Sequence, residues 1–401
     1  MVGAATDVGA LRPVRPTHVV AVVGPGEWPD GCREASERRA AVLGIGLRWV
    51  EVADEDAAAQ VVRTAAGDGA AVLLASGTLA DRQAVAAAAA QPAVPVVHVD
   101  TVPVTIRGPV RQACDRVIHG RGRASFTWAL RWLATAVDRP GLVHAYGPDR
   151  VNQVAELRLP DPAVRVPSVA ADTGTWPVVL LVHGGFWLDW WQRDLMDGLA
   201  VGLTRRGWAT WNLEYRRTGP SGGGWPGSLE DACAGVDAIA DVAADHPLDL
   251  ARVVLIGHSA GAQLAAYATA RSRLPARAPG CVPRVAATGF VSLAGVLDLD
   301  AAAAQDLGAG AVRAYLGDPA QRTDRVRLGS PQRLVPLGVD SLVVHGIEDR
   351  LVPPDHSRGY AELAALAGDD VTLELVAGDH FTLIDPTDAA SDTVLGWLEA
   401  R

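Results

Sequence analysis

The segment best suited to chemistry is Gly257–Gly261, which reads GHSAG. The apolar run Val253–Ile256 precedes it, and a helix-like stretch begins at Ala260. G-x-S-x-G between a strand and a helix is typical of a nucleophile elbow, a tight turn that projects the serine hydroxyl. The alternative is a glycine-rich turn with a capping serine, but the flanking strand and helix favour a nucleophile. We predict that Ser259 is that nucleophile and that the N–H of Ala260 helps to bind an oxyanion.

A serine hydroxyl needs a general base, and the base needs a carboxylate that orients it. His380 lies in a short turn after an apolar strand, whereas His356 lies within an expected helix and is predicted to be at the surface. Asp349 lies just beyond the strand expected at Ser341–His345. The chain order Ser, Asp, His is one in which such triads occur. We therefore predict a triad of Ser259, Asp349 and His380.

Three other carboxylates are alternatives to Asp349. Glu348 is adjacent to it, Asp298 follows the preceding expected strand, and Asp379 is next to His380. Asp379 is disfavoured because adjacent residues in a turn seldom point at each other. Glu348 and Asp298 stay open as orienting carboxylates.

A second glycine-rich turn, His183–Trp187 with the sequence HGGFW, follows the apolar run Val178–Val182. Glycines let a backbone approach a developing negative charge closely, so N–H groups of this turn can complete an oxyanion site. HGG alone is weak evidence, but its place after a buried strand and ahead of GHSAG makes it strong. His183 is expected to hold the turn by hydrogen bonds and not to act as a second base.

The elements that position these residues follow from hydrophobic runs that alternate with helix-like stretches, the pattern of parallel sheets covered by helices. The pattern predicts two α/β domains, 1–140 and 141–401, joined near Asp138–Gly147. Asp298–Pro336 fits poorly between sheet elements and is a candidate cap over a site. The strands expected in the first domain are His18–Val23, Leu47–Val52, Ala70–Leu74 and Val94–Val99, and its helices are Cys32–Leu43, Asp56–Ala66, Leu79–Ala90 and Ala124–Val137. The second domain is expected to add strands at Val178–Val182, Trp208–Leu213, Val253–Ile256, Val285–Leu293, Ser341–His345 and Val371–Val376, and helices at Ala260–Arg271, Asp355–Leu366 and Ala389–Glu399.

With these motifs, the second half resembles the α/β-hydrolase superfamily, in particular its HGG-type esterases and the kynurenine formamidase-like branch. The resemblance covers about Tyr146–Arg401 and rests on HGGFW at 183–187, EYR at 214–216, GHSAG at 257–261, HGIED at 345–349 and GDHF at 378–381. It implies oxyanion donors at Gly185, Phe186 and Ala260, and hydrolysis of a small ester or amide through an acyl-enzyme. The most specific substrate that the resemblance implies is an N-formylated arylamine, although the fold itself does not determine the substrate.

The first half, about His18–Val137, resembles type II dehydroquinases, which have a flavodoxin-like fold. Gly24-Pro25 is similar to that family's NGPN turn, Val96–His98 to its EVH segment, and Gly120–Gly122 to its closing G-x-G. The family's catalytic tyrosine lid has no counterpart, since no tyrosine occurs before Tyr146. We therefore expect a non-catalytic domain, kept for assembly or for shaping the neighbouring site, with a structural role for its histidine. A bifunctional enzyme with both halves active is the alternative.

Tryptophan is concentrated around the HGG turn, because seven of the twelve fall within residues 176–225. Trp208 and Trp211 are expected in the core of a strand. Three others end this turn or follow it closely, and they either line a substrate pocket or pack at a domain or subunit contact: Trp187, Trp190 and Trp191.

The composition narrows the range of partners. The net charge is -10, which argues against nucleic acid and against a polybasic membrane anchor. No run approaches the roughly 18 apolar residues that span a bilayer, and no apolar secretory segment opens the chain, so we expect a cytoplasmic protein. The four cysteines lie far apart in no metal-like spacing. With no P-loop or dinucleotide fingerprint in context, we expect no metal and no cofactor.

Two further expectations concern the reaction and the assembly. The substrate is expected to be a small molecule, and acyl transfer or cyclisation by the same triad is an alternative to hydrolysis, because water access to the acyl-enzyme decides between them. Homo-oligomerisation through the N-terminal domain is implied by its resemblance to a family that assembles through such domains.

Overall fold

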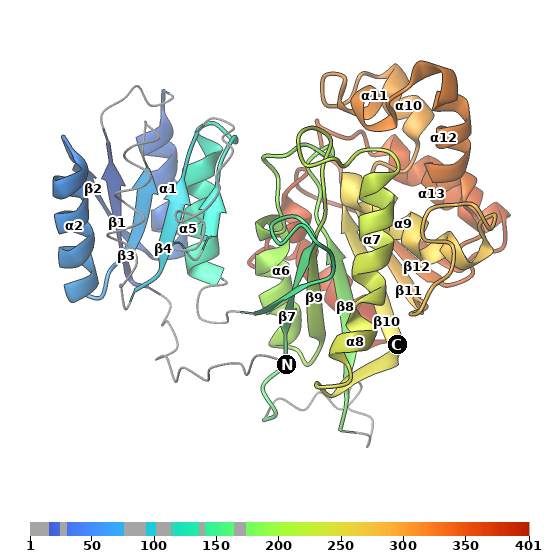
Figure 1. Ribbon diagram of the computed structural model, residues 1–401, viewed down its shortest axis with the longest axis horizontal. Helices are drawn as coiled ribbons and strands as arrows, with labels where there is room; N and C mark the ends of the chain where they lie inside the picture. Colours follow the sequence, from blue (N-terminus) through green and yellow to red (C-terminus); the bar gives the residue numbers. More distant parts are fainter. Residues whose placement is uncertain are drawn as a thin grey trace. The chain divides into compact units, whose positions relative to one another are not determined.

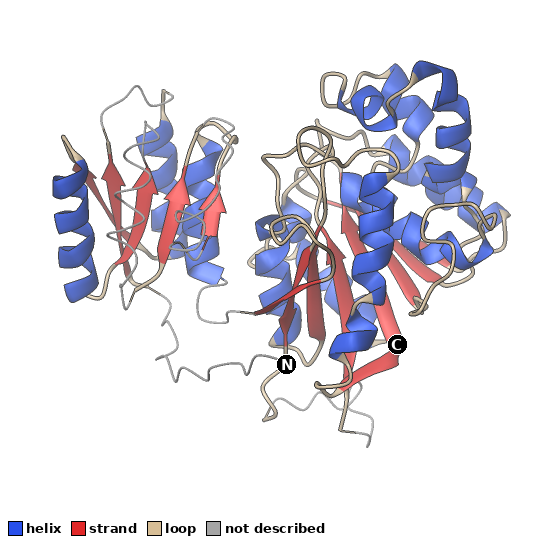
Figure 2. Ribbon diagram, in the orientation of Figure 1, coloured by secondary structure: helices blue, strands red, loops and turns tan. Residues whose placement is uncertain are grey.

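The computed structural model describes residues 16–24, 30–75, 94–101, 114, 116–135, 141–163 and 174–400. The chain divides into two compact units, residues 1–140 and residues 141–401 (Figure 1). In each unit a sheet is covered by helices (Figure 2). Among the described residues, no helix is long and apolar enough to cross a membrane.

The first unit is built on a parallel sheet of five strands in the order β2-β1-β3-β4-β5. Valine-rich runs form its central strands, since branched side chains suit a pleated surface that is covered on both faces. Every residue of β3 and β4 is buried. The order is flavodoxin-like, as predicted. The strands are β1 (His18–Val23), β2 (Gly46–Glu51), β3 (Ala71–Ala75), β4 (Val96–Val99) and β5 (Arg116–Ile118).

Three described helices cover this sheet: α1 (Cys32–Leu43), α2 (Glu55–Gly67) and α5 (Ala124–Thr135). The carboxylate of Asp54 caps α2 by accepting the N–H of Ala57 at 2.8 Å, which satisfies one of the helix's free donors. The predicted bounds of α1 are confirmed. The helix predicted at Leu79–Ala90 lies outside the described residues.

The second unit holds a mixed sheet of eight strands in the order β13-β12-β11-β10-β8-β9-β7-β6. β7 is antiparallel to β6 and to β9, and the remaining neighbours are parallel. Central strands β8 and β10 carry consecutive apolar residues because helices cover both faces. The strands are β6 (Leu142–Ala145), β7 (Val154–Arg158), β8 (Trp176–Val182), β9 (Ala209–Glu214), β10 (Leu248–His258), β11 (Gly289–Leu293), β12 (Asp340–Gly346) and β13 (Val371–Val376).

The principal helices of this unit are α6 (Asp194–Thr204), α7 (Gly227–Asp237), α8 (Ile239–Val242), α9 (Ala260–Ala270), α13 (Asp355–Leu366) and α14 (Ala390–Glu399). Trp208 and Trp211 are buried, as predicted. β11 begins four residues later than predicted. Val285 is a loop residue, and because its side chain is buried, its apolar character resembles that of a strand residue.

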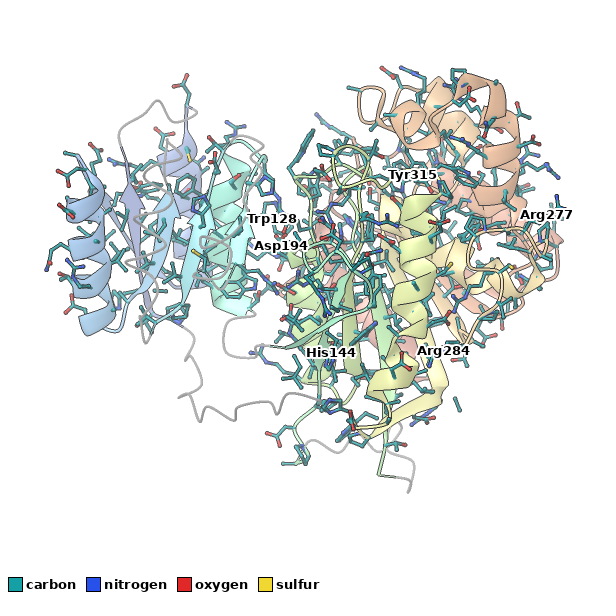
Figure 3. The ribbon with its side chains drawn as sticks, viewed as in Figure 1. Trp128, His144, Asp194, Arg277, Arg284 and Tyr315 are labelled. Carbon is teal, nitrogen blue, oxygen red and sulfur yellow. The ribbon has the colours of Figure 1, made fainter. Side chains whose placement is uncertain are left out.

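Three short helices lie within the candidate cap: α10 (Leu299–Ala304), α11 (Ala311–Leu316) and α12 (Arg322–Gly329). They lie together at the end of the sheet where the parallel strands finish, at the upper right of Figure 1. Tyr315 of α11 anchors them: its carbonyl accepts the N–H of Trp225 at 2.9 Å, and its ring is fully buried. Figure 3 places Tyr315 between these helices and the body of the unit.

The turn from β10 into α9 packs against the end of β8 with no room for side chains. A Cβ at Gly261 would lie 2.2 Å from the carbonyl oxygen of Val182 and 2.4 Å from that of His183. Because both neighbours are backbone atoms, neither can move aside. The sequence GHSAG therefore needs its last glycine for packing as well as for the turn.

We predict opposite effects for two glycine-to-alanine substitutions. Gly261→Ala should lower the free energy of unfolding by about 3 kcal/mol or more, because its methyl group overlaps backbone. Gly359→Ala, within α13 and with nothing within 4 Å of the new Cβ, should raise it by about 0.5–1 kcal/mol. Urea unfolding followed by circular dichroism measures both, and equal stabilities of the two variants would contradict this packing argument.

Candidate active site

The three residues of the predicted triad follow three strands of one sheet. Ser259 follows β10, Asp349 lies three residues beyond β12, and His380 lies four residues beyond β13. These strands are parallel to one another within the sheet, so their carboxyl ends meet at one edge. That edge is where sites form in open α/β sheets. The topology thus brings the predicted residues together although 121 positions separate the first from the last.

Ser259 has the strained backbone of a nucleophile elbow, with φ 55° and ψ -123°. Its side chain is buried, and its Oγ has no hydrogen-bond partner among the described residues. Small neighbours permit this turn: a Cβ at Gly257 would lie 2.4 Å from Cα of Ala262, and one at Gly184 would lie 2.7 Å from Cβ of Ser259. The HGG turn therefore lies directly against the serine.

Asp349 and His380 form a short ion-pair-like contact. Nδ1 of His380 donates to Oδ2 of Asp349 at 2.6 Å, and the N–H groups of Leu351 and Val352 donate to Oδ1 at 2.8 and 3.0 Å. Burial alone would raise the pKa of the Asp349 carboxyl, but hydrogen bonds from His345 and His380 hold that pKa well below its ordinary value. The carboxylate is therefore ionised and able to stabilise an imidazolium.

The rival carboxylates have other partners or lie in the open. Asp298 caps α10 by accepting the N–H groups of Asp300 and Ala301. Asp379 accepts the N–H groups of Phe381 and Thr382 within its own turn. Glu348, the remaining alternative, is exposed. Of these candidates, Asp349 is the one that hydrogen-bonds the His380 ring.

Two histidines differ from what the sequence suggests. His356 lies in α13 as predicted, but it is buried and not at the surface, because its face of the helix packs inward beside Gln305, 3.4 Å from its Nε2. His258, given no role above, donates from Nε2 to the carbonyl oxygen of His380 at 2.9 Å. The neighbour of Ser259 thus holds the loop that carries His380.

The HGG turn is a run of positive φ angles: 111° at Gly185, 50° at Phe186 and 56° at Trp187. A Cβ at Gly185 would lie 2.1 Å from Cβ of Trp191, so the turn folds tightly back on itself. Ala260 is the first residue of α9, where N–H groups have no partner within the helix. The predicted oxyanion donors therefore lie in the two segments that meet at Ser259.

His183 holds this turn by hydrogen bonds, as predicted. Its Nδ1 donates to the carbonyl oxygen of Gly184 at 2.8 Å, and its Nε2 donates to Oε1 of Glu214 at 3.0 Å. Its ring stacks on Tyr215, with ring centres 4.4 Å apart, and the Tyr215 hydroxyl donates to the carbonyl oxygen of His183 at 2.9 Å. Both ring nitrogens thus face oxygen atoms of the HGG turn and of Glu214, and these contacts fix the orientation of the ring.

Glu214 is the centre of a buried charge cluster that sequence reasoning missed. It is fully buried and also accepts from the Arg217 guanidinium and from the N–H of Arg193. Burial would raise the pKa of its carboxyl, but the charges of Arg217, His183 and Arg193 hold that pKa far below its ordinary value. The EYR motif at 214–216 is the sequence signal for this cluster, although the motif alone does not reveal that the carboxylate is buried.

The three candidate pocket tryptophans separate into two kinds. Trp187 is fully buried: its ring stacks on Tyr315 with ring centres 4.2 Å apart, and its Nε1 donates to Gln263 at 3.3 Å. This burial argues against its predicted place in a pocket wall. Trp190 and Trp191 are half-buried, and Trp191 stacks on Phe381 beside the histidine, with ring centres 5.8 Å apart.

A cavity of about 650 Å³ opens beside His380. It is formed by the two loops that carry Asp349 and His380, and its wall combines apolar and charged side chains: Ile347, Leu351, Phe381, Glu348, Arg350 and Asp379. Ile347 and Leu351 are 56% and 43% exposed, so apolar surface is available to a ligand there.

His98 is fully buried within β4, in keeping with a structural role. No group of three or more His, Cys, Asp or Glu side chains in the described part of the chain could hold a metal ion.

The charge cluster makes a prediction for stability. Glu214→Gln should lower the free energy of unfolding by about 3–5 kcal/mol at pH 7, because it leaves buried cations without their anion. The control Glu230→Gln, at an exposed position of α7, should change it by less than about 0.5 kcal/mol. Urea unfolding measures both variants.

The same comparison has a pH dependence. A depressed pKa of Glu214 in the folded state means that its stabilisation is full above the unfolded value, about 4.3, and is lost as the pH falls. The stability gap between the wild type and Glu214→Gln should therefore be constant above about pH 5.5 and shrink below it. A gap that widens in acid would contradict the charge assignment.

Residues 165–363 match the family model described as BD-FAE. The matched span contains the HGG turn, Ser259 and Asp349, and it ends before His380.

Solved structures similar to this chain carry esterase names. A truncated carbohydrate esterase from gut microbiota is 18% identical, with a TM-score of 0.53, and the match covers 67% of this chain and 99% of that one. A carboxylesterase from Lactobacillus plantarum is 22% identical, with a TM-score of 0.50 and coverages of 62% and 91%. Esterase B from Lactobacillus rhamnosis, inhibited by a tributyrin phosphonate, is 20% identical, with a TM-score of 0.55 and coverages of 68% and 89%. Together with the strand order, these likenesses show that the second unit has the α/β-hydrolase fold.

Proposed function

We propose that the second unit is a serine hydrolase that cleaves a small ester through Ser259, His380 and Asp349. The observation that carries the proposal is the 2.6 Å hydrogen bond between Asp349 and His380 at the sheet edge where Ser259 occupies a strained elbow. A nucleophile, a base and an orienting carboxylate on adjoining strand ends are the parts that acyl transfer requires.

The proposed reaction proceeds in two halves. Oγ of Ser259 attacks the substrate carbonyl carbon while Nε2 of His380 takes the hydroxyl proton, and the N–H groups of Gly185, Phe186 and Ala260 bind the resulting oxyanion. The His380 imidazolium then gives its proton to the leaving oxygen as the bond to the acyl carbon breaks. Water, deprotonated by His380, attacks the acyl-enzyme and releases the acid. Asp349 stays ionised throughout and stabilises the imidazolium.

Esters are proposed ahead of formamides and other amides. The compared structures are named as esterases. Acyl transfer to an acceptor other than water uses the same residues, so it is the second candidate reaction.

We propose that the cavity beside His380 receives the leaving group of the ester. The general acid must reach the leaving oxygen, so this part of the substrate lies on the histidine's side of the serine. Ile347, Leu351 and Phe381 offer apolar contacts there. We infer that the alcohol released from the ester is at least partly apolar.

We propose that the first unit is not a catalyst and serves assembly of a cytoplasmic homo-oligomer. Its five-stranded flavodoxin-like sheet supports the resemblance to type II dehydroquinases in fold, while the missing tyrosine lid argues against their chemistry. The competing proposal is a bifunctional enzyme.

Labelling should identify the nucleophile. Intact-mass spectrometry after reaction with a fluorophosphonate should show a single adduct on the wild type and on Ser272→Ala, an exposed serine control, and none on Ser259→Ala. With a p-nitrophenyl ester, Ser259→Ala should lose about 10⁶-fold in kcat and Asp349→Asn about 10⁴-fold. An adduct that persists in folded Ser259→Ala would contradict the proposal.

The full chain should sediment as a species larger than a monomer at micromolar concentration and should leave dehydroquinate unchanged. Analytical ultracentrifugation and an absorbance assay for dehydroshikimate measure the two properties. A monomer would remove the assembly role, and turnover of dehydroquinate would favour the bifunctional enzyme.

A further inference from the structure

We propose that His345, held in place by Ser357, is a positioning residue that holds the catalytic carboxylate of Asp349 through the same oxygen that accepts from His380. This inference rests on the proposed function, since it assigns the carboxylate to the triad. His345 does not contact Ser259 in any described hydrogen bond, so its effect on the reaction passes through Asp349.

The contacts of His345 form a continuous chain. Nδ1 of His345 lies 2.6 Å from Oγ of Ser357, and Nε2 lies 3.1 Å from Oδ2 of Asp349. The same Oδ2 accepts from Nδ1 of His380 at 2.6 Å. All four side chains are buried, with His345 and Ser357 fully so. These hydrogen bonds form a series that runs from Ser357 through His345 and Asp349 to His380, the proposed base.

The chemistry of the partners decides which nitrogen of His345 carries the proton. Nε2 faces the Asp349 carboxylate and the carbonyl oxygen of Val352, at 2.9 Å, and both groups can only accept. Nε2 must therefore be protonated. The Ser357 hydroxyl can donate, so it can satisfy the lone pair on Nδ1. Without Ser357, Nδ1 of this buried ring would lose its hydrogen-bond partner.

This arrangement holds both oxygens of the Asp349 carboxylate. Oδ1 is held by the N–H groups of Leu351 and Val352, and Oδ2 is held by the two histidines. His345 also bonds Val352 at the far end of the turn, so one ring at the end of β12 closes the loop on which Asp349 sits. A rotation of the carboxylate away from His380 would break contacts on both oxygens.

Other titratable groups near this ring leave the assignment intact. His356, one residue before Ser357, feels the charge of His345 and of Asp298, Asp349 and Asp355. Burial first, and then the neighbouring His345, lower the pKa of His356, while the carboxylates oppose that shift. Its Nε2 faces Gln305 and not Asp349, so it provides a control.

Kinetics on matched variants tests the role. His345→Leu should lower kcat about 10- to 100-fold with KM changed less than twofold, because a displaced carboxylate misorients the base without altering substrate contacts. His345→Gln places an amide N–H near the position of Nε2 and should recover most of that loss. Ser357→Ala should cost a few-fold alone and nothing further in His345→Leu, since it acts through the ring. His356→Gln should leave kcat within about twofold.

A measurement on the unmodified enzyme decides the case even if His345→Leu fails to fold. Nitrogen-15 histidine NMR of the wild type, assigned by the signals missing in His345→Gln, should show His345 in the Nε2–H tautomer. The Nδ1–H tautomer, or full kcat in folded His345→Leu, would overturn the inference. Failure of the proposed function is distinguishable, because then the wild type itself would not react with the fluorophosphonate.

Discussion

The contact on which the active end of the molecule depends is one between backbones. The first turn of α9 lies so close to the end of β8 that a Cβ at Gly261 would fall 2.2 Å from a main-chain carbonyl. This approach places the strained Ser259 beside the HGG turn, and Gly184 lies against the serine's own Cβ. The proposed nucleophile and the proposed oxyanion donors of the HGG turn lie more than 70 positions apart, so their juxtaposition is a property of strand order and of residues with no side chain.

Two buried carboxylates hold the histidines of the proposed site. Glu214 and Asp349 are both buried carboxylates, each kept ionised by cations or hydrogen-bond donors, and each bonded to a histidine. Glu214 holds His183 and through it the HGG turn, while Asp349 holds His380, the proposed base. Such groups cost free energy to bury and repay it only when all partners are present. The two halves of the site are therefore rigid where the chemistry needs fixed geometry.

The fold was largely predictable because each central strand is a continuous apolar run and the helices between them have distinct boundaries. Cys32–Leu43 and Asp355–Leu366 were placed to the residue. The strands that sequence reasoning missed lie at or near sheet edges: β7 contains Glu156 and Arg158, whose polar side chains hide a buried strand. Those two residues are buried because they bond each other at 2.7 Å, a pairing that a strand pattern does not show.

The sequence by itself predicted the chemistry, since GHSAG, HGGFW and GDHF match local patterns, each only a few residues long, that are typical of a nucleophile, a donor turn and a base. Only the tertiary structure decided which carboxylate meets His380, because Asp298, Glu348, Asp349 and Asp379 all carry carboxylates and their contacts become distinct only in the folded chain. It likewise decided that Trp187 is core and that His345 meets Asp349. Such choices depend on distances between elements far apart in the chain, and these distances exist only once the sheet has formed.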